Sequence, residues 1–280
     1  MTVKIVTDSV ADLPSQVVEE LGITVIPLNV RFGEEVYRDG IDLTAEQFYH
    51  KLEHSEILPV TSVPSPAAFA EAYDKLVEET DGILVITLSA RLSGTYDVAL
   101  QSVGLVKRKC RIEIVDSQWA VMAQGFMVMA AARAAEAGVS LDEVVDITHR
   151  NMKRVDMRAA FDTLDYLKRG GRIGAAQALL GSILKVNPIL TLRNGVVHPV
   201  GREHSRAKAI DYLYNFAMSF SHIEEMAVED AACPDDAELL VERLGSIFPK
   251  ERIYRSKTTP VIGTHTGPGL LLVAVLGDRE

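Results

Sequence analysis

The feature that most constrains the fold is the regular alternation of apolar runs and helical stretches in the first half of the chain. Short runs with the composition of strands occur at residues 3–7, 23–30, 83–88 and 111–115. Stretches with helical composition occur at 14–20, 44–53, 66–79, 94–106 and 119–135. Strands that alternate with helices of about ten to fifteen residues form βαβ units. An open, mostly parallel sheet with flanking helices is therefore predicted.

The second half of the chain has a different pattern. Helices are expected at 141–153, 175–184, 206–220 and 235–247. Asn194-Gly195 separates two apolar runs and is the strongest short-range signal for a β-hairpin. A hairpin combined with sequence-distant strands predicts a mixed or antiparallel sheet. We therefore expect two α/β domains, residues 1–155 with the anion-binding loops and residues 156–280 with a histidine loop and a basic surface.

Composition excludes several classes of protein. A formal net charge of −10 argues against a nucleic-acid partner, which requires a basic surface. The two cysteines do not make a disulfide framework, and the first ten residues lack the features of a signal peptide, so a cytoplasmic protein is expected. Gln124, Gly125 and Arg133 interrupt the Met/Ala-rich stretch 119–135, which predicts a buried core helix and no stable membrane insertion. A monomer is the expected oligomeric state.

Charge is distributed unevenly along the chain. Residues 150–208 contain 12 Lys and Arg and 4 Asp and Glu, so this window carries 12 − 4 = +8 and the remainder carries −18. Two interpretations remain open. The cations form separate solvated faces, or they form one surface that receives an anionic ligand or an acidic partner.

Small hydroxyl and acidic residues are grouped in four loops. These loops are Thr7-Asp8-Ser9, Thr61-Ser62-Val63-Pro64-Ser65, Leu92-Ser93-Gly94-Thr95-Tyr96 and Asp116-Ser117. Each of them alone is an ordinary helix cap or turn. An open α/β sheet binds ligands at the carboxyl ends of its strands, so we expect the four loops on one edge of one sheet. Together they offer the hydroxyls and amides that carboxylate or phosphate oxygens need.

Two later segments also carry chemistry. His265 lies between glycines in Gly263-Thr264-His265-Thr266-Gly267-Pro268-Gly269, which predicts a ring held on a tight loop. Leu167-Lys168-Arg169-Gly170-Gly171-Arg172-Ile173 predicts a turn between helical segments with three cations. Dinucleotide-binding and phosphate-binding glycine loops, HExxH and CxxC are missing from the sequence, so neither a nucleotide cofactor nor a metal is expected.

A serine esterase is one functional alternative. It would use Ser93, His265 and an acid such as Asp116 or Asp8. The sequence around Ser93 is Arg91-Leu92-Ser93-Gly94, which lacks the first glycine of a GxSxG nucleophile elbow. A carrier of another anionic amphiphile is a further alternative.

The ordered set of segments resembles the DegV family. The resemblance begins with Thr7-Asp8-Ser9 and Ala11-Asp12-Leu13-Pro14, and continues in order through 61–65, 92–96, Asp116-Ser117, 167–173 and 263–269. It extends from residue 3 to about residue 276. Val63 is a departure, since glutamine stands there in many members, and no side-chain contact is carried over at that position.

The resemblance implies a bacterial fatty-acid-binding protein that presents a palmitate- or oleate-like carboxylate to a separate ATP-binding fatty acid kinase subunit. The product would be an acyl phosphate for phospholipid synthesis, and this chain would be non-catalytic. Matching motifs imply carboxylate contacts from Thr61, Ser62, Ser93, Gly94, Thr95 and His265. They also imply partner or phosphate contacts from Arg172, Arg202 and Arg206.

A soluble carrier of a long acyl chain must contain an apolar tunnel. Burial of each methylene contributes about 0.8 kcal/mol, which the cost of association offsets in part. Met122, Met127 and Met129 are candidates for the tunnel lining because methionine side chains adapt their shape. Plain core packing is the alternative for these three residues.

Overall fold

The computed structural model describes residues 3–80, 82–180 and 186–279 and contains three β-sheets. In the four-stranded sheet all strands are parallel, in the order β2 (Thr24–Ile26), β1 (Lys4–Asp8), β6 (Gly82–Thr87), β7 (Arg111–Asp116). The six-stranded sheet is mixed, in the order β10 (Val196–Glu203), β9 (Asn187–Arg193), β8 (Val155–Ala160), β13 (Leu271–Asp278), β11 (His222–Asp230), β12 (Ile253–Lys257). The third sheet is antiparallel, in the order β4 (Glu35–Arg38), β3 (Asn29–Phe32), β5 (Val60–Ser62). The predicted fold class is confirmed.

Ten α-helices connect the described strands. They are α1 (Ser15–Glu20), α2 (Ala45–His54), α3 (Pro66–Leu76), α4 (Thr95–Ser102), α5 (Val121–Glu136), α6 (Leu141–Met152), α7 (Asp165–Arg169), α8 (Arg206–Met218), α9 (Pro234–Leu244) and α10 (Pro260–Thr266). Short 3-10 helices are η1 (Ser9–Ala11), η2 (Val103–Leu105), η3 (Gly174–Leu179) and η4 (Lys250–Arg252). The helix expected at 175–184 is the 3-10 turn η3, and residues 181–184 lie outside the described part.

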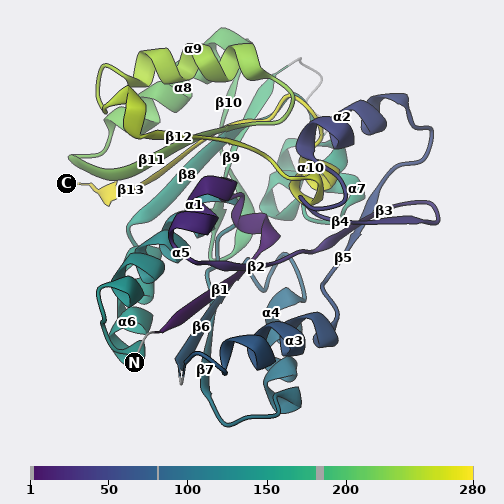
Figure 1. The fold of residues 1–280 in the computed structure, drawn as a ribbon. Helices are drawn as coiled ribbons and strands as arrows, with labels where there is room; N and C mark the ends of the chain where they lie inside the picture. The colour runs from purple at the N-terminus through teal and green to yellow at the C-terminus, as the bar shows by residue number, and fades with distance from the viewer. Residues whose placement is uncertain (1–2, 81, 181–185, 280) are drawn as a thin grey trace.

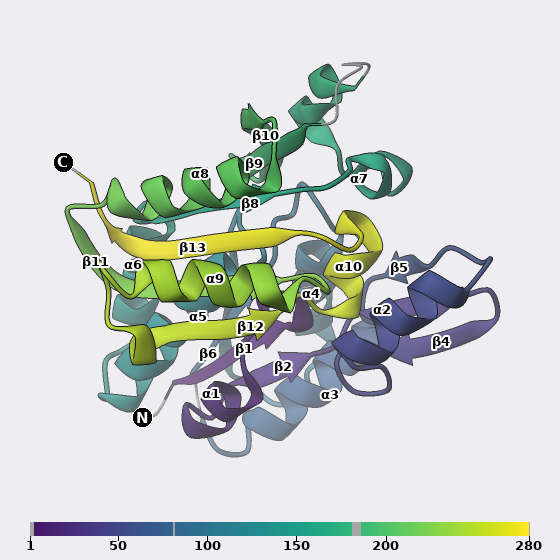
Figure 2. The ribbon, with the colours of Figure 1, turned by 90° about the horizontal axis from the view of Figure 1, so that it is seen from above.

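The elements form stacked layers (Figure 1). Helices α8 and α9 cover one face of the six-stranded sheet, as Figure 2 shows from above. The other face of that sheet packs on α5, and α5 in turn packs with α6 on the four-stranded sheet. Helices α3 and α4 cover the remaining face of the four-stranded sheet. One apolar core therefore joins residues from both halves of the chain, and the division into two domains stays a prediction.

Helix α5 is buried over most of its surface because it lies between the two large sheets, which explains its lack of a polar face. The residues that interrupt its apolar sequence each make a specific contact. Gln124 donates to Thr7 Oγ1 at 3.0 Å, Gly125 allows the close approach of the Ala11 carbonyl, and Arg133 pairs with Glu225. Within the described residues, no helix combines the length and apolarity that a bilayer crossing needs.

The predicted strand at 23–30 is instead two strands in different sheets. β2 ends at Ile26, and β3 begins at Asn29 in the three-stranded sheet. Pro27 stands between them and has no N–H to donate to a strand ladder, so the chain leaves the parallel sheet at this point. Thr61 lies in β5 beside β3 and therefore belongs to this separate sheet.

The hairpin at Asn194-Gly195 is confirmed. Both residues have positive φ, 50° and 77°, as a two-residue hairpin turn between β9 and β10 requires. The turn contacts the loop after β6, where Ser89 Oγ donates to the Gly195 carbonyl at 2.8 Å. This hydrogen bond joins the tip of the C-terminal hairpin to the edge of the parallel sheet.

Candidate functional site

An apolar pocket lies between the six-stranded sheet and the carboxyl ends of the parallel strands. Four lining residues come from the segments that follow the four parallel strands: Val10, Leu28, Leu88 and Ala120. The opposite wall comes from the inner face of β8, β9 and β13: Met157, Ala159, Leu192 and Leu272. The space between atoms, with the open mouth included, is about 770 Å³.

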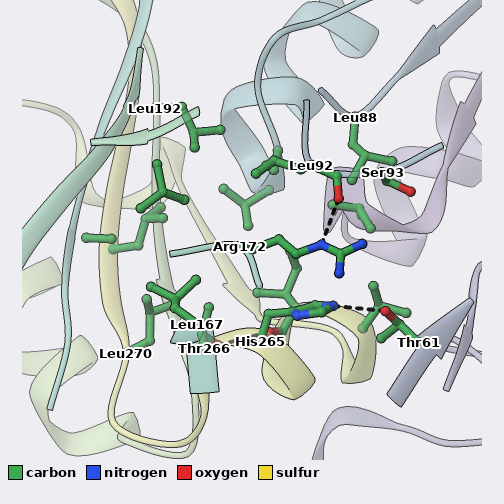
Figure 3. Close-up of a pocket in the computed structure, with 18 of the residues that line it drawn as sticks. Thr61, Leu88, Leu92, Ser93, Leu167, Arg172, Leu192, His265, Thr266 and Leu270 are labelled. Atoms are coloured by element: carbon green, nitrogen blue, oxygen red, sulfur yellow. Dashed lines mark hydrogen bonds between the residues drawn. The ribbon is translucent and has the colours of Figure 1, made fainter. Parts of the chain in front are cut away.

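Polar side chains gather at one end of the pocket (Figure 3). Thr61 Oγ1 lies 2.9 Å from Nε2 of His265, and the guanidinium of Arg172 lies between this pair and Ser93. Arg172 is fixed by its Nε, which donates to the Leu92 carbonyl at 2.9 Å. Leu192 lies at the opposite end of the pocket from Thr61 and His265. The pocket therefore has a polar end and an apolar end, the shape that an amphiphile requires.

His265 is in the last turn of α10, and the prediction of a tight loop was wrong. Pro260 occupies the first helical turn, and Gly263 has the small size needed where α10 crosses the rings of Phe48 and Tyr49. Gly267 ends the helix with φ 69°. The glycines around His265 thus allow a closely packed helix, which orients the ring more firmly than a loop would.

Contacts from the N-terminal half hold α10 in place. Asp39, buried after β4, accepts the Val261 N–H at 3.0 Å and the Ser9 hydroxyl at 2.6 Å. On the other side, a Cβ on Gly170 would overlap Nδ1 of His265, so only glycine leaves room for the ring. The position of His265 therefore depends on residues from three distant segments.

Burial is the main cause that lowers the pKa of His265 to about 4, and the positive charge of Arg172 lowers it further. The imidazole is therefore neutral at pH 7, with Nε2 facing Thr61 and Nδ1 buried without a hydrogen-bond partner in the described structure. A neutral ring can donate one N–H, and Arg172 supplies the positive charge. A carboxylate at this end would be charge-balanced by Arg172.

The candidate residues divide into two groups. Thr61, Ser93 and His265 line the pocket, whereas Ser62, Gly94 and Thr95 do not. Ser62 and Gly94 are exposed, and Thr95 is buried beneath Ser93, where the two hydroxyls lie 2.9 Å apart. Arg172 also lines the pocket, although its motif implied a partner or phosphate contact.

The other two arginines expected to contact a partner have different environments. Arg202 is exposed on β10. Arg206 donates to Asp236 at 2.7 Å and to the Gly269 carbonyl at 2.8 Å. Arg206 thus joins α8, α9 and the segment before β13, and this structural engagement argues against a free partner-binding role.

The four loops do not all lie on the edge of one sheet, because Thr61 belongs to the three-stranded sheet, and of the hydroxyl and acidic side chains in these loops Thr61 and Ser93 line the pocket. The side chains after the parallel strands instead form hydrogen bonds within the loops and between them. Asp8 accepts from the N–H groups of Val10 and Leu88, and Asp116 accepts from those of Ala90 and Gln118. The hydroxyls donate to Asp39 from Ser9, to the Gly195 carbonyl from Ser89 and to the Trp119 carbonyl from Ser117. The apolar residues next to them form the pocket instead. The sequence analysis did not identify these apolar residues. Apolar side chains shortly after a strand were a usable signal, because turns are usually polar.

The methionine tunnel is also not observed. Met122, Met127 and Met129 are fully buried in the core around α5 and do not line the pocket. The residues of this region that reach the pocket are Ala120 and Val121, at the start of the helix. Core packing is therefore the correct interpretation of the three methionines.

The geometry does not support a serine-hydrolase triad. Ser93 Oγ pairs with Thr95, and His265 pairs with Thr61. Nδ1 of His265 has no acidic partner in the described structure. Asp116 and Asp8 accept hydrogen bonds from loop amides. Among the described residues, no group of His, Cys, Asp and Glu is arranged to hold a metal ion.

The fold and the site define an α/β protein of three sheets, with an apolar pocket that carries neutral hydroxyls, a neutral imidazole and one guanidinium at one end. A family model described as "uncharacterised protein, DegV family" matches residues 2–278. The chain belongs to the DegV family. It is 41% identical over 278 residues to a DegV domain-containing protein of Streptomyces coelicolor, covering 98% of each chain.

Solved structures of this family share the fold. A DegV family protein from Thermus thermophilus, described for its fatty acid binding, is similar with a TM-score of 0.91 and 33% identity, covering 99% of this chain and 100% of that one. DegV of Bacillus subtilis, described as a fatty acid binding protein, is similar with a TM-score of 0.89, 33% identity and the same coverage.

Proposed function

We propose that the protein binds a long-chain fatty acid, with the acyl chain in the apolar pocket and the carboxylate among Thr61, Ser93, Arg172 and His265. The observation that carries the proposal is the segregation of the pocket: its polar groups gather at one end, and aliphatic side chains line the rest. The descriptions of the Thermus and Bacillus relatives as fatty acid binding support the same ligand class.

Energetics agree with a fatty acid in this pocket. Each buried methylene contributes about 0.8 kcal/mol, so the chain supplies most of the affinity. The hydroxyls and Arg172 replace the water lost from the carboxylate with charge-assisted hydrogen bonds. Because His265 is neutral at pH 7, Arg172 provides the positive charge among the described residues that line the polar end of this pocket.

The direct test is lipid extraction from the purified protein followed by mass spectrometry. We expect palmitate- or oleate-like acids at up to one molecule per chain, with tight uptake of added palmitate by lipid-stripped protein. A different co-purifying amphiphile would favour the alternative carrier. Lipid-free protein that fails to take up palmitate would refute the proposal.

A matched pair of variants tests the carboxylate site. Thr61→Ala is expected to weaken palmitate binding by about 1–3 kcal/mol, because the pocket-facing hydroxyl hydrogen-bonds a charged group. Ser62→Ala, at the neighbouring exposed position, is expected to leave the affinity unchanged. Calorimetry on both proteins measures the difference, and equal affinities would place the carboxylate elsewhere.

We further propose that the bound carboxylate is presented to a separate ATP-binding kinase subunit and converted to acyl phosphate. The exposed mouth, where Arg172 is accessible, supports access to the carboxylate from outside. Lysate from the source cell, supplied with ATP and labelled palmitate bound to this protein, provides the assay. Acyl phosphate is trapped with hydroxylamine.

Arg202→Ala is expected to lower the rate of acyl phosphate formation several-fold while palmitate affinity stays unchanged, because an exposed charge that contacts a partner acts on association. Arg108→Ala is the control, since Arg108 is also exposed but precedes β7, at the amino end of the parallel sheet. A loss of palmitate binding in Arg202→Ala, or equal rates for the two variants, would count against the docking role.

A further inference from the structure

The six-stranded sheet contains an opening between β8 and β9. These strands pair only at Ala159 with Leu190 and Ala160 with Ile189. Both strands continue beyond this point, to Val155 at the start of β8 and to Arg193 at the end of β9. These two segments do not pair with each other. A second cavity lies beside the separated ends, which we name the β8–β9 cleft. Its lining residues are Trp119, Met152–Asp156, Arg158, Thr191–Arg193, Phe220 and Gly277–Arg279.

Positive charge dominates the β8–β9 cleft. Five cations from the end of α6, from β8, from β9 and from the end of β13 line it: Lys153, Arg154, Arg158, Arg193 and Arg279. Two lining acids face them, Asp156 and Asp278, and Glu224 beside the cleft pairs with Arg154 at 2.9 Å, which leaves an excess of two positive charges. This excess is unusual in a chain with a net charge of −10.

The two acids are already engaged by three of the arginines. Asp278 pairs with Arg154 at 2.7 Å, and Asp156 pairs with both Arg158 and Arg279. Within the described residues, Lys153 and Arg193 have no acidic partner. The cleft therefore offers two uncompensated cations beside a fixed network of arginines.

The base of the cleft is rigid. The side chains of Arg158 and Asp156 are only 14% and 19% exposed, and Arg158 also packs over the ring of Phe216. Thr191 lies 3.3 Å from both Arg158 and Asp156, which bridges the opening between the strands. Guanidinium groups held in this way lose little conformational entropy when they bind an anion.

The basic window of residues 150–208 thus does not form one surface. Four of its cations line the β8–β9 cleft, Arg172 is at the mouth of the apolar pocket, and Arg206 is bound to Asp236. The fatty-acid proposal uses Arg172 and leaves the four cations of the cleft without a role.

We propose that the β8–β9 cleft is a second ligand site, which binds the phosphate or diphosphate group of a small molecule. Phosphate carries more than one negative charge, which the excess of two positive charges can balance, and its oxygens match the forked donors of arginine. The site does not depend on the fatty-acid proposal, because the four cations from the window and Arg279 lie outside the apolar pocket.

Calorimetric titration with inorganic pyrophosphate, and separately with glycerol 3-phosphate, tests this site. We expect saturable binding of one molecule per chain that weakens as salt is added. Tighter binding of pyrophosphate identifies a diphosphate as the preferred group, and tighter binding of glycerol 3-phosphate identifies a phosphate monoester. Failure of both probes to bind saturably would overturn the proposal.

A double charge reversal locates the site. Lys153→Glu with Arg193→Glu is expected to weaken binding of the better probe by about tenfold or more, since hydrogen bonds to charged groups are lost. The matched control, Arg108→Glu with Arg150→Glu, changes the net charge equally at exposed positions outside the cleft. Circular dichroism and the melting temperature verify folding. Equal affinities for the two double variants would contradict the assignment.

Discussion

Replacement of Leu192 by tryptophan is expected to weaken palmitate binding by about 200-fold and to leave decanoate binding unchanged. Leu192 lies at the end of the pocket away from Thr61 and His265, where the last carbons of a long chain would lie (Figure 3). An indole ring there displaces about four methylenes, each worth about 0.8 kcal/mol. A shorter acid keeps its carboxylate contacts and does not reach the ring.

The comparison between two acids separates occlusion from misfolding. Overpacking costs about 1–3 kcal/mol of stability, which thermal unfolding of the variant would measure. Leu239→Trp is the control, because Leu239 is 51% exposed on α9, away from the pocket. If palmitate and decanoate lose affinity equally in Leu192→Trp, the acyl chain does not extend toward β9.

Local sequence patterns were sufficient to predict most of the strands and helices and the hairpin at Asn194-Gly195, because each depends on periodicity or on a turn dipeptide, but they missed the break in the strand at 23–30 and the helix α10. These patterns do not indicate which distant segments of the chain lie next to each other in the fold. Pro27 moves β3 out of the parallel sheet, and this places Thr61 in another sheet, next to His265. The pairing of Thr61 with His265 spans 204 positions and depends on how α10 packs against α2.

Side-chain roles were harder to predict than side-chain positions. Hydroxyls and acids after the parallel strands were expected to bind a ligand, but loop amides also need partners, and they bind Asp8 and Asp116 first. Arg172 is the opposite case, since it was expected to contact a partner or a phosphate and it lines the pocket. Its basic turn predicted a surface contact, whereas the Leu92 carbonyl holds the guanidinium at the pocket.

Four of the buried carboxyl groups among the described residues have raised pKa values: Asp8, Asp12, Asp39 and Glu229. Burial raises the pKa of Asp8 to about 7 and that of Asp39 to about 6. Burial, together with repulsion from the charge of Glu229, raises the pKa of Asp12. Burial also raises the pKa of Glu229. Within the described residues, both Oδ atoms of Asp12 and Oε2 of Glu229 have no hydrogen-bond partner, and a proton shared between the two carboxyls would join Oε2 to one Oδ.

These groups make the protein less stable as the pH rises from about 4 to about 7. In this range the folded protein holds protons that the unfolded carboxyls, with pKa values near 4, have released. His265 acts in the opposite direction below about pH 6.5, because its pKa is lowered, but it is one group against four. Urea unfolding is expected to give a free energy of unfolding higher at pH 5.5 than at pH 8 by about 2–4 kcal/mol.

Glu229→Gln should remove a large part of this pH dependence and stabilise the protein at pH 8 by about 1 kcal/mol or more. The glutamine Oε1 can still accept the Met122 N–H, which now binds Glu229 at 2.7 Å, and the new amide can donate to the Asp12 carboxylate. Glu224→Gln, on the same strand but half-exposed and paired with Arg154, should change stability by no more than about 1 kcal/mol at either pH. If Glu229→Gln destabilises the protein equally at pH 5.5 and pH 8, Glu229 is ionised in the folded state and its charge is required.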